Sequence, residues 1–539
     1  MSDTTLRFAL LAMLGLGACT ESTTDDGPPP PGTRSREDVV REHMESLRGD
    51  PSALAAFLRD MPKGADLHNH TSGAIATEKL IQWGAEDGAC VNTTTYVASN
   101  PCASGTVPLS RTAEDPAFHD SVLRAWSMQD HPGPLMAAHQ HFFDAFGKYS
   151  AVQKEWRNDD SFADVLSRAG QHRLIYVELM QGFGASDSGK LAEGLFTVSD
   201  PWDEATLRAR RQQLIEQPAF QAALTKQADT IQDTLRGSRE LLRCGTPEAD
   251  PGCDVEVRLL VSASRTASRE SVFGQWVHAY ELAQHVPELV GVNLVAPEEN
   301  KNSLAYYDDE MSALGWLDDL NQEPGHKRVH VSLHAGELIP EVLKGQDQDH
   351  LDFHIRNAVE KAHAKRIGHG VDVLGETAGD GAEDLLRDMH AAGVMVEICL
   401  TSNRVLLGAT GTKHPLARYL ENQVPVALAT DDPGILRGDI SQEYLAAATD
   451  QGLDYSRLKQ MARTSLEYSF AEGAGLWARR GDFTEPVGAC ARDTPGVPPL
   501  SLECERYLTA HKRAALQWKL EGQLAGFEGS VVKGVQNPR

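Results

Sequence analysis

Two adjacent carboxylates, Asp431 and Asp432, end an apolar run that begins at Val424. A carboxylate buried without a partner is costly, so an acid in this position usually faces solvent, caps a helix, pairs with a cation or binds a metal ion. Imidazole is the side chain that most often completes such a metal site. A metal at Asp431 therefore requires histidines at the ends of other apolar runs.

Three histidines meet this requirement. His68 and His70 end one apolar run, and His334 ends another. Residues i and i+2 of a strand point to the same face, so His68 and His70 can bind a single ion. With Asp431 they make four ligands and leave a position for water, which suits zinc or another borderline divalent ion. We predict one ion per chain, bound by His68, His70, His334 and Asp431.

Glu337 and His369 also end predicted strands, and neither is needed as a ligand. A metal ion lowers the pKa of bound water toward neutrality, but attack of the resulting hydroxide on an sp2 carbon still requires proton transfer. We assign that work to these two residues. Glu337 can hand a proton to a ring nitrogen if an enclosed site raises its pKa. Asp432, which should point away from Asp431, is expected to hydrogen-bond the substrate.

Eight short runs rich in Val, Ile and Leu must position these side chains. They alternate with helix-like stretches, which is the pattern of a parallel sheet, and eight of them predict a closed (β/α)8 TIM barrel. The carboxyl ends of such strands meet at one mouth, so residues far apart in sequence come together there. The predicted strands are Ala65–His70, Leu174–Met180, Glu256–Val261, Leu289–Ala296, Arg328–Ala335, Arg366–His369, Val394–Cys399 and Val424–Thr430.

The barrel is predicted to span residues 61–525, after a helical leader at 37–60. A stretch rich in Thr, Ser, Asn and Gly at about 84–111 predicts an inserted loop or subdomain after the first strand. A second insertion at about 187–254 is mostly helical by pattern, and extra helices are predicted at about 442–525, beyond the last strand. Residues 526–539 are expected to be a tail.

The charge balance narrows the class of partner. The chain has 539 residues, with 77 acidic against 51 basic side chains and a formal net charge of -26. Nucleic acids and anionic lipids are themselves polyanions, so this charge disfavours both as partners. We therefore predict a small molecule as the partner, and the sequence leaves the oligomeric state open.

The first 18 residues have the pattern of a signal peptide, because Arg7 precedes an apolar run, Phe8–Ala18, that is too short to span a bilayer. The segment Leu16–Cys19 resembles the lipobox of bacterial lipoproteins, which predicts cleavage before Cys19 and lipidation of that cysteine. Residues 19–36 then form a flexible tether. The protein should be an extracytoplasmic lipoprotein of the cell envelope, attached to the membrane only through this lipid. An ordinary signal peptide with a chance cysteine, and hence secretion, is the alternative.

Six of the eight cysteines fall into sequence-local couples. An oxidising compartment would let each couple close a short loop, and no couple has the C-x2-C spacing or the histidine partner of a zinc finger. These observations favour disulfides. Cys399 lies within an apolar run and is expected to be a small core residue. The predicted pairs are Cys90 with Cys102, Cys244 with Cys253, and Cys490 with Cys504.

A series of motifs, taken in order, resembles the adenosine deaminase family within the metal-dependent hydrolase superfamily. They are Met61–His70, His334–Glu337, Arg366–Gly370, Glu397 with Ser402–Asn403, His414–Pro415 and Thr430–Pro433. The resemblance implies a barrel with a catalytic zinc ion on the four ligands named above. It also implies hydrolytic deamination of adenosine or 2'-deoxyadenosine, a purine nucleoside, by zinc-bound hydroxide. Within the family, the chain is most similar to the secreted adenosine deaminase growth-factor branch. This similarity lies in the insertion with its cysteine pair, the segment Phe142–Gly147 and the predicted extracytoplasmic location.

The same resemblance implies roles for individual residues. Glu337 would donate a proton to purine N1, His369 would orient and deprotonate the water, and Asp432 would contact purine N7. Two positions depart from the family pattern. Ser72 stands where the family usually has an acid that meets the ribose hydroxyls, and its neutral hydroxyl loses the strength of a charge-assisted hydrogen bond. Ala296 replaces a glycine whose backbone amide contacts the purine.

Ser72 keeps a related function open, the deamination of another aminopurine or of an N6-substituted adenine compound. An alternative of a different class is an anchored nucleoside-binding protein without turnover. Glu337 and His369 argue against it, because binding alone needs neither residue. A hydrolase of another amide or ester is disfavoured by the fourth strand, where Asn293 and Ala296 occupy the region of a metal-bridging lysine.

Two further residues are expected to support the site from behind. Glu178 and Glu397 end apolar strands and can orient the residues that bind the metal. His414 precedes Pro415 near a predicted helix start, so a structural role is expected for it.

Overall fold

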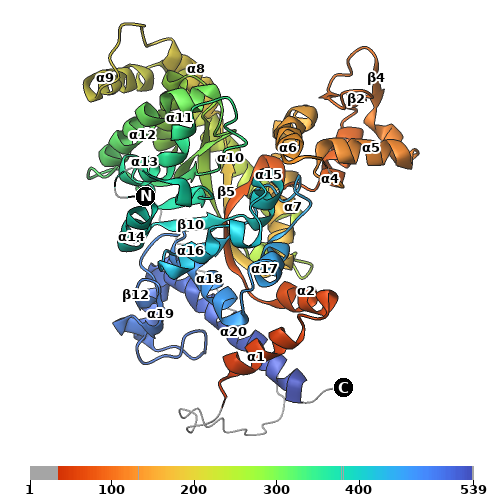
Figure 1. The fold of residues 1–539 in the computed structure, drawn as a ribbon, viewed down its shortest axis with the longest axis vertical. Coiled ribbons are helices and arrows are strands. Elements are labelled where there is room, and N and C mark those ends of the chain that lie inside the picture. The colour runs from red at the N-terminus through yellow and green to blue at the C-terminus, as the bar shows by residue number, and fades with distance from the viewer. Residues whose placement is uncertain (1–33, 132, 378, 380, 537–539) are drawn as a thin grey trace, which may run out of the picture.

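Eight parallel strands form one sheet that curves into a nearly closed barrel, as predicted (Figure 1). The strand order is β1-β5-β6-β7-β8-β9-β10-β11. The strands are β1 Gly64–His70, β5 Leu174–Gln181, β6 Glu256–Ser264, β7 Leu289–Val295, β8 His330–Ala335, β9 Arg366–His369, β10 Met395–Ile398 and β11 Val426–Leu428. The computed structural model describes residues 34–131, 133–377, 379 and 381–536. The predicted signal peptide, Cys19 and the tether as far as residue 33 lie outside these ranges.

The barrel strands are buried on both faces, which explains their continuous apolar character. In β8, Val331 and Leu333 belong to the main hydrophobic core. Ser332 and His334 alternate with them and point into the barrel, toward Glu397 and the other histidines. The interior of this barrel is therefore polar near its mouth, while the helices outside cover the apolar face.

The seam between β1 and β11 closes the barrel through few hydrogen bonds. One isolated parallel bridge links the two strand ends. The backbone N–H of His70 donates to the carbonyl of Asp431 at 3.0 Å, and the N–H of Asp431 donates to the carbonyl of His68 at 2.8 Å. This pairing places His68, His70 and Asp431 side by side at the mouth.

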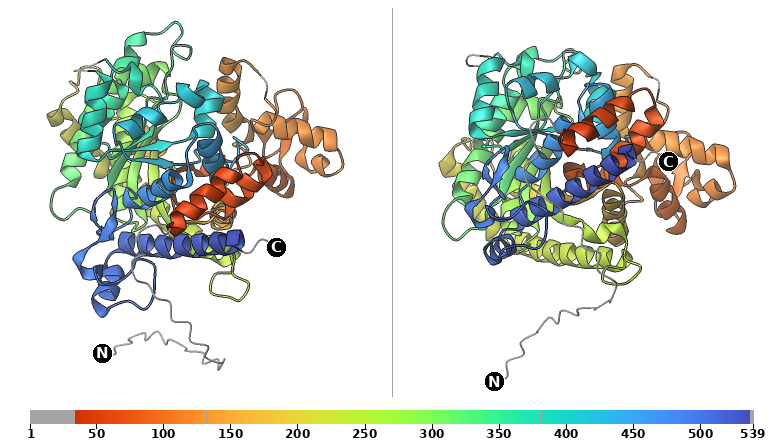
Figure 2. Two further views of the ribbon diagram at one scale, coloured as in Figure 1. Left: turned by 60° about the horizontal axis from the view of Figure 1, so that its bottom comes forward. Right: turned by 90° about the horizontal axis from the view of Figure 1, so that it is seen from below.

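Helices cover the outside of the barrel and fill the connections between its strands (Figure 2). Those between β1 and β7 are α3 Thr71–Ala74, α4 Thr77–Glu86, α5 Pro116–Trp126, α6 Leu135–Tyr149, α7 Asn158–Gln171, α8 Ala185–Glu193, α9 Glu204–Ile215, α10 Pro218–Leu241 and α11 Arg269–Ala283. Those between β7 and β11 are α12 Lys301–Asn321, α13 His354–Glu360, α14 Ala382–Ala392, α15 Leu400–Leu407 and α16 Leu416–Glu421.

The long connection between β1 and β5 projects from the barrel, in orange in Figure 1. Residues of the predicted insertion at about 84–111 form a three-stranded antiparallel sheet of order β3-β2-β4. Its strands are β2 Cys90–Asn92, β3 Ala98–Ser99 and β4 Thr106–Pro108. Helix α6 packs against α15, so this connection returns to the barrel mouth.

The three predicted disulfides are present, at Cys90–Cys102, Cys244–Cys253 and Cys490–Cys504. The second joins the end of α10 to the short turn before β6, within the helical connection predicted at about 187–254. Cys399 is free and buried, as predicted for a core residue.

The two ends of the described chain pack together on one side of the barrel (Figure 2). The leader forms α1 Arg36–Ser46 and α2 Pro51–Asp60. Beyond β11 come α17 Ile440–Thr449, α18 Tyr455–Glu467, the hairpin of β12 Trp477–Arg479 and β13 Asp482–Pro486, α19 Leu502–Ala510 and α20 Lys512–Gln536. No helix within the described ranges is long and apolar enough to cross a bilayer.

The prediction of a tail from residue 526 is wrong, because α20 continues to Gln536. Phe527 packs edge-on against Phe57 of α2, with ring centroids 5.2 Å apart. Glu528 accepts a hydrogen bond from Lys459 of α18 at 2.6 Å. These partners come from distant parts of the sequence, so local periodicity does not reveal that the last turns of the helix are held in place.

Candidate metal centre and active site

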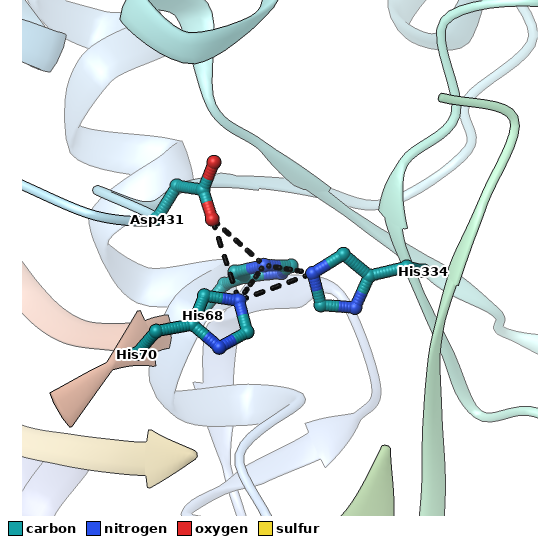
Figure 3. A group of neighbouring side chains, drawn as sticks. All are labelled: His68, His70, His334 and Asp431. Atoms are coloured by element: carbon teal, nitrogen blue, oxygen red, sulfur yellow. Dashed lines mark hydrogen bonds and ion pairs between the residues drawn. The ribbon is translucent and has the colours of Figure 1, made fainter. Parts of the chain in front are cut away.

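Four side chains from three strand ends meet at the mouth of the barrel (Figure 3). His68 and His70 lie on β1, His334 lies on β8, and Asp431 follows β11. One ligand atom from each lies within 4.8 Å of all the others. Gly368 of β9 leaves room for the ring of His68, because a Cβ there would lie 2.6 Å from the His68 Cε1. The structure thus brings together all four predicted ligands.

The distances among these atoms match those around a tetrahedral metal ion. The Nε2 atoms of His68, His70 and His334 are separated by 3.0, 3.1 and 3.2 Å. Oδ1 of Asp431 lies 3.4 Å from the Nε2 atoms of both His68 and His70. Ligands about 2.0–2.1 Å from a tetrahedral ion are about 3.3 Å from one another. The side chains are therefore already placed to share one ion.

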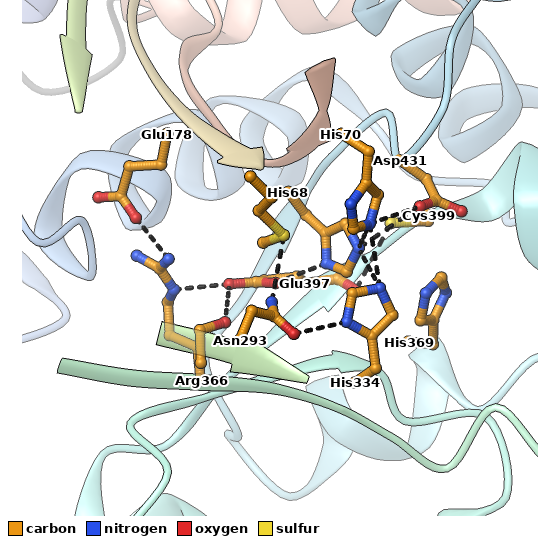
Figure 4. Close-up of polar contacts among 12 residues, drawn as sticks. His68, His70, Glu178, Asn293, His334, Arg366, His369, Glu397, Cys399 and Asp431 are labelled. Atoms are coloured by element: carbon orange, nitrogen blue, oxygen red, sulfur yellow. Dashed lines mark hydrogen bonds and ion pairs between the residues drawn. The ribbon is translucent and has the colours of Figure 1, made fainter. Parts of the chain in front are cut away.

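The outer ring nitrogens of two histidines fix which tautomer each one adopts (Figure 4). Nδ1 of His68 lies 2.7 Å from Oε2 of Glu397, and Nδ1 of His334 lies 2.7 Å from Oδ1 of Asn293. Both oxygens are acceptors, so each neutral ring carries its hydrogen on Nδ1. In these neutral forms the lone pairs of the two Nε2 atoms point at the same position, where one metal ion would bind both.

Glu397 is a buried carboxylate held in a network of cations and donors. Its Oε1 accepts hydrogen bonds from Ser332 at 2.9 Å and from Arg366 at 2.6 Å. Arg366 also donates to Glu178 at 2.5 Å, which places both predicted supporting acids behind the ligands. Burial raises the pKa of Glu397, but Arg366 and His68 outweigh burial and lower the pKa to about 2. Glu397 therefore stays charged and holds His68 in its metal-binding orientation.

The same carboxylates make the metal site attractive to positive charge. Burial lowers the pKa of His68, yet its interactions with Asp431 and Glu397 outweigh burial and raise the pKa to about 10. Burial, together with the neighbouring ring of His68, lowers the pKa of His70 to about 3 and that of His334 well below its ordinary value. The latter two rings are therefore neutral, which is the state that binds metals.

Glu337 lies buried at the same mouth, beyond the end of β8. Its backbone N–H donates to Oε2 of Glu298 at 2.7 Å, and its carboxyl lies 3.9 Å from Nη2 of Arg265. Burial raises the pKa of Glu337 well above its ordinary value, and the charge of Asp431 adds to this, although Arg265 opposes it. The enclosed site therefore favours the protonated form of this carboxyl group.

The carboxyl group of Asp432 lies against Gly73. A Cβ at Gly73 would lie 1.8 Å from Oδ1 of Asp432, so only glycine leaves room for the carboxyl group. Burial raises the pKa of Asp432 well above its ordinary value, and the adjacent charge of Asp431 adds to the effect. Its Oδ1 is buried without a hydrogen-bond partner among the described residues, which is the state of a group that awaits a ligand.

His369 ends β9 and presents Nε2 to the same space. This atom lies 3.7 Å from Oε1 of Glu337 and has no hydrogen-bond partner among the described residues. Nδ1 of the ring lies 2.9 Å from Nδ2 of Asn403, and Oδ1 of Asn403 lies 3.0 Å from Nε2 of His414. Burial lowers the pKa of His369 to about 4, so the ring is neutral at neutral pH.

Comparison with known proteins shows similarity to purine deaminases. A model of the adenosine deaminase family matches residues 228–475. An adenine deaminase from Sinorhizobium medicae is 30% identical over 234 residues, which cover 43% of this chain and 63% of the relative. An adenosine deaminase from Klebsiella pneumoniae is 32% identical over 246 residues, which cover 45% of this chain and 64% of the relative. Residues 228–475 of this chain therefore match the adenosine deaminase family.

A solved structure agrees with the fold of this chain. An amidohydrolase from Burkholderia ambifaria, crystallised with bound zinc, aligns with a TM-score of 0.50 at 14% identity. The alignment covers 78% of this chain and 89% of that protein. The curated relatives, in contrast, are matched over less than two thirds of their own length. Placement in the secreted growth-factor branch stays a prediction.

The candidate active site opens into a cavity of about 440 Å³, within the usual range for small-molecule sites. Its lining includes the acidic groups described above and a set of apolar side chains. The acidic groups include Glu337, Asp431 and Asp432, and the apolar side chains include Phe142, Phe143, Phe146, Val295 and Pro297. The three phenylalanines come from α6, which packs over the mouth from the projecting connection.

The two positions that depart from the family pattern both line this cavity. Ser72 is exposed, and its carbonyl accepts hydrogen bonds from Tyr149 and Gln153. Ala296 has a φ of +82°, a conformation that L residues rarely adopt and that glycine tolerates. The alanine therefore keeps the backbone shape that a glycine would give, with a methyl group added to the wall.

Arg265 and Glu298 are part of the site, and the sequence analysis missed both. Arg265 is fully buried beyond β6, where Nε donates to the carbonyl of Ala296 at 2.6 Å and Nη1 to the carbonyl of His334 at 3.3 Å. Glu298 accepts the N–H groups of Gly336 and Glu337. The available signal was a charged residue just beyond a buried strand, the same signal that Glu337 gave.

Proposed function

We propose that this protein is a metal-dependent aminohydrolase that removes the 6-amino group of adenosine or 2'-deoxyadenosine. Water is consumed, and the products are inosine or 2'-deoxyinosine and ammonia. One observation carries the proposal: a four-ligand metal set and a proton-bearing carboxyl group, Glu337, open into the same cavity. The family match supports it, because the matched relatives are named adenosine and adenine deaminases.

The donor set fits a zinc ion. Three imidazole nitrogens and one carboxylate oxygen lie at tetrahedral spacing, and the hydrogen bonds of Glu397 and Asn293 aim two of the rings. Such an ion lowers the pKa of water toward neutrality and so supplies a nucleophile at working pH. We propose zinc, one ion per chain, as the native metal.

Glu337 and Asp432 are not metal ligands, and their pKa values decide whether they donate hydrogen bonds to the purine or accept them. Because Glu337 is protonated, it can donate to ring nitrogen N1, which gains electron density when the adjacent carbon is attacked. Purine N7 carries a lone pair, so Asp432 can contact it only as a donor, and its raised pKa supplies the necessary proton. His369 faces the attacking water with Nε2.

The cavity favours a neutral ligand. Neither lysine nor arginine stands among the described residues that line it, so a phosphate group would lack a cationic side chain there, and the phenylalanines of α6 offer apolar surface to a base or an uncharged sugar. We therefore propose a nucleoside rather than a nucleotide. Deamination of adenine itself, or of an N6-substituted adenine compound, is the second candidate, because Ser72 lacks the charge with which the family usually meets the ribose.

An ultraviolet assay tests the proposal. Mature protein loaded with zinc should shift the absorption of adenosine and release ammonia, and a chelator should abolish both signals. Adenosine, 2'-deoxyadenosine, adenine, N6-methyladenosine and AMP should be compared on one preparation, with Glu337→Gln as the inactive control. If every compound stays unchanged with zinc present, the proposal fails. Adenosine binding without turnover would instead support the nucleoside-binding alternative.

We also propose an extracytoplasmic location, as a lipoprotein anchored through Cys19. The three disulfides support it, since such bonds persist in oxidising compartments. Expression with a labelled fatty acid should transfer the label to the wild-type chain and leave the Cys19→Ser chain unlabelled. An unlabelled wild-type protein in the culture medium would favour the alternative of a secreted protein.

A further inference from the structure

A backbone N–H group determines the state of His414. The N–H of Leu416, at the start of α16, donates to Nδ1 of His414 at 3.1 Å. A backbone amide cannot change from donor to acceptor, so Nδ1 must carry a lone pair. His414 is buried, and burial lowers its pKa to about 4, which keeps the ring neutral. A neutral ring has one hydrogen, and here that hydrogen must lie on Nε2.

The orientation of Asn403 follows from His414. Nε2–H of His414 donates to Oδ1 of Asn403 at 3.0 Å, so Nδ2 of the same amide faces Nδ1 of His369 at 2.9 Å. The reversed amide would point its NH2 group at Nε2 of His414. Both nitrogens of that ring would then have to accept, which a neutral imidazole cannot do. The arrangement of this chain of three side chains is therefore determined.

We propose that His414 and Asn403 are positioning residues that keep the hydrogen of His369 on Nε2, where it points into the active site. Since Asn403 donates to Nδ1 of His369, that nitrogen must accept, and the ring hydrogen lies on the other side. Nε2 is the buried atom that has no partner among the described residues. His369 thus offers a donor, and not a lone pair, to the oxygen that attacks the purine.

This assignment changes the expected role of His369 and, in that part, rests on the proposed function. The family resemblance implied that His369 both orients and deprotonates the water. With its hydrogen on Nε2, the ring holds the attacking oxygen by donating to it and is not the first acceptor of the water proton. His414, for which the sequence indicated only a structural role, takes part in setting the direction of this hydrogen bond.

Neutron diffraction on the metal-loaded mature protein, exchanged into deuterated buffer at neutral pH, tests the proposal directly. Deuterium is expected on Nε2 of both His369 and His414, with Nδ1 of each ring bare. Deuterium on Nδ1 of His369 would overturn the proposal. This readout does not depend on turnover, so an inactive wild-type protein would refute the proposed function and leave the tautomer assignment to be judged on the neutron map.

The Asn403→Asp variant supplies the kinetic test. A carboxylate can only accept from His369, so its hydrogen should move to Nδ1 and leave a lone pair facing the substrate. We expect kcat to fall by about a hundredfold or more, the scale at which acid-base groups act, with metal content and KM close to those of wild type. Asn321→Asp, an equally buried amide at the end of α12, is the matched control and should keep wild-type kcat. Unchanged kcat in Asn403→Asp would refute the proposal, and if that variant does not fold, the neutron result decides alone.

Discussion

At the scale of single residues, Glu337 shows how burial prepares a side chain for chemistry. Its carboxyl group is enclosed and lies near the charge of Asp431, and both effects raise its pKa. Glu298 accepts a hydrogen bond from the backbone N–H of Glu337. Its carboxylate also forms an ion pair with Arg265. The pKa of Glu337 is thus raised while that of Glu298 is lowered to about 2, because Glu298 also accepts hydrogen bonds from His354 and from two backbone N–H groups.

Substitution of Glu337 by Gln should separate catalysis from metal binding. The amide keeps the shape of the side chain but cannot release a proton, so kcat should fall by about 10²- to 10⁴-fold. The metal content should equal that of wild type, because Glu337 is not one of the four converging ligands. Steady-state kinetics and elemental analysis on the same preparation check both statements. Loss of the ion would mean that Glu337 has been assigned wrongly.

The pH dependence of kcat should reflect the raised pKa of Glu337. The protonated form is the donor, so activity is present below that pKa and is lost as pH rises through it. A pH profile of kcat for deamination should therefore have a falling limb at a pH well above the ordinary pKa of a glutamate. A profile whose only limb lies at the ordinary pKa of a glutamate would contradict the assignment.

Gly73 should be required for the position of Asp432. A Cβ at this position would overlap with the carboxyl group, so Gly73→Ala must displace Asp432 or the backbone. A shift of about 1 Å can cost about a hundredfold in rate, and we expect a loss of that order in kcat/KM. Gly49→Ala, where a Cβ meets nothing within 4 Å, is the control. Equal kcat/KM in both variants would show that Asp432 does not contact the substrate.

At the scale of elements, the seam between β1 and β11 carries three of the four ligands. Strand β11 has only three residues, and the backbone pairing across the seam is sparse. Asp66 strengthens it, since its Oδ2 accepts from Oγ1 of Thr430 at 2.6 Å and from Nδ2 of Asn69 at 3.2 Å. This buried carboxylate therefore joins the two strand ends whose side chains bind the ion.

Removal of Asp66 should weaken metal binding without removing a ligand. Asp66→Ala loses the side-chain link across the seam, and residues that support ligands from behind typically contribute about 10- to 100-fold in affinity. Competition with a chromogenic chelator measures this change. Asp60→Ala, an exposed acid at the end of α2, controls for the loss of charge. If Asp66→Ala binds zinc as tightly as Asp60→Ala, the seam is held by its backbone alone.

The limits of the strands and helices show where local sequence patterns are sufficient to predict the structure. The barrel strands were predictable because apolar runs of strand length are local features, and each observed strand overlaps its predicted range. The end of α20 was not predictable from local patterns, because Phe527 packs on α2 and Glu528 bonds to α18. A helix that extends only because distant elements pack on it leaves little trace in its own periodicity.

At the scale of the whole molecule, the metal should also stabilise the fold. The site buries Asp431 and Glu397 beside three imidazoles, and removal of the ion leaves their charges less well compensated. Zinc at about 100 times its Kd should add about 2.7 kcal/mol to the free energy of unfolding. Denaturant unfolding with zinc and with chelator measures the difference. His334→Ala should abolish it, and a wild-type protein equally stable in both conditions would contradict a shared ion.

The sequence alone was enough to predict the barrel, the three disulfides and the set of residues that converge at the mouth. Strand periodicity, the H-x-H spacing and a charged residue at the end of an apolar run are local signals, and a parallel barrel brings strand ends together whatever lies between them. For this reason the sequence alone predicts that His68, His334 and Asp431 lie together.

Tertiary structure alone decided how those residues are held and in which chemical state. The burial of Arg265, the ionisation of Glu298 and the tautomer of His369 depend on partners from other elements, at distances and angles that no spacing in the sequence encodes. A pKa or a tautomer is a property of the enclosed environment, and that environment exists only once the chain has folded.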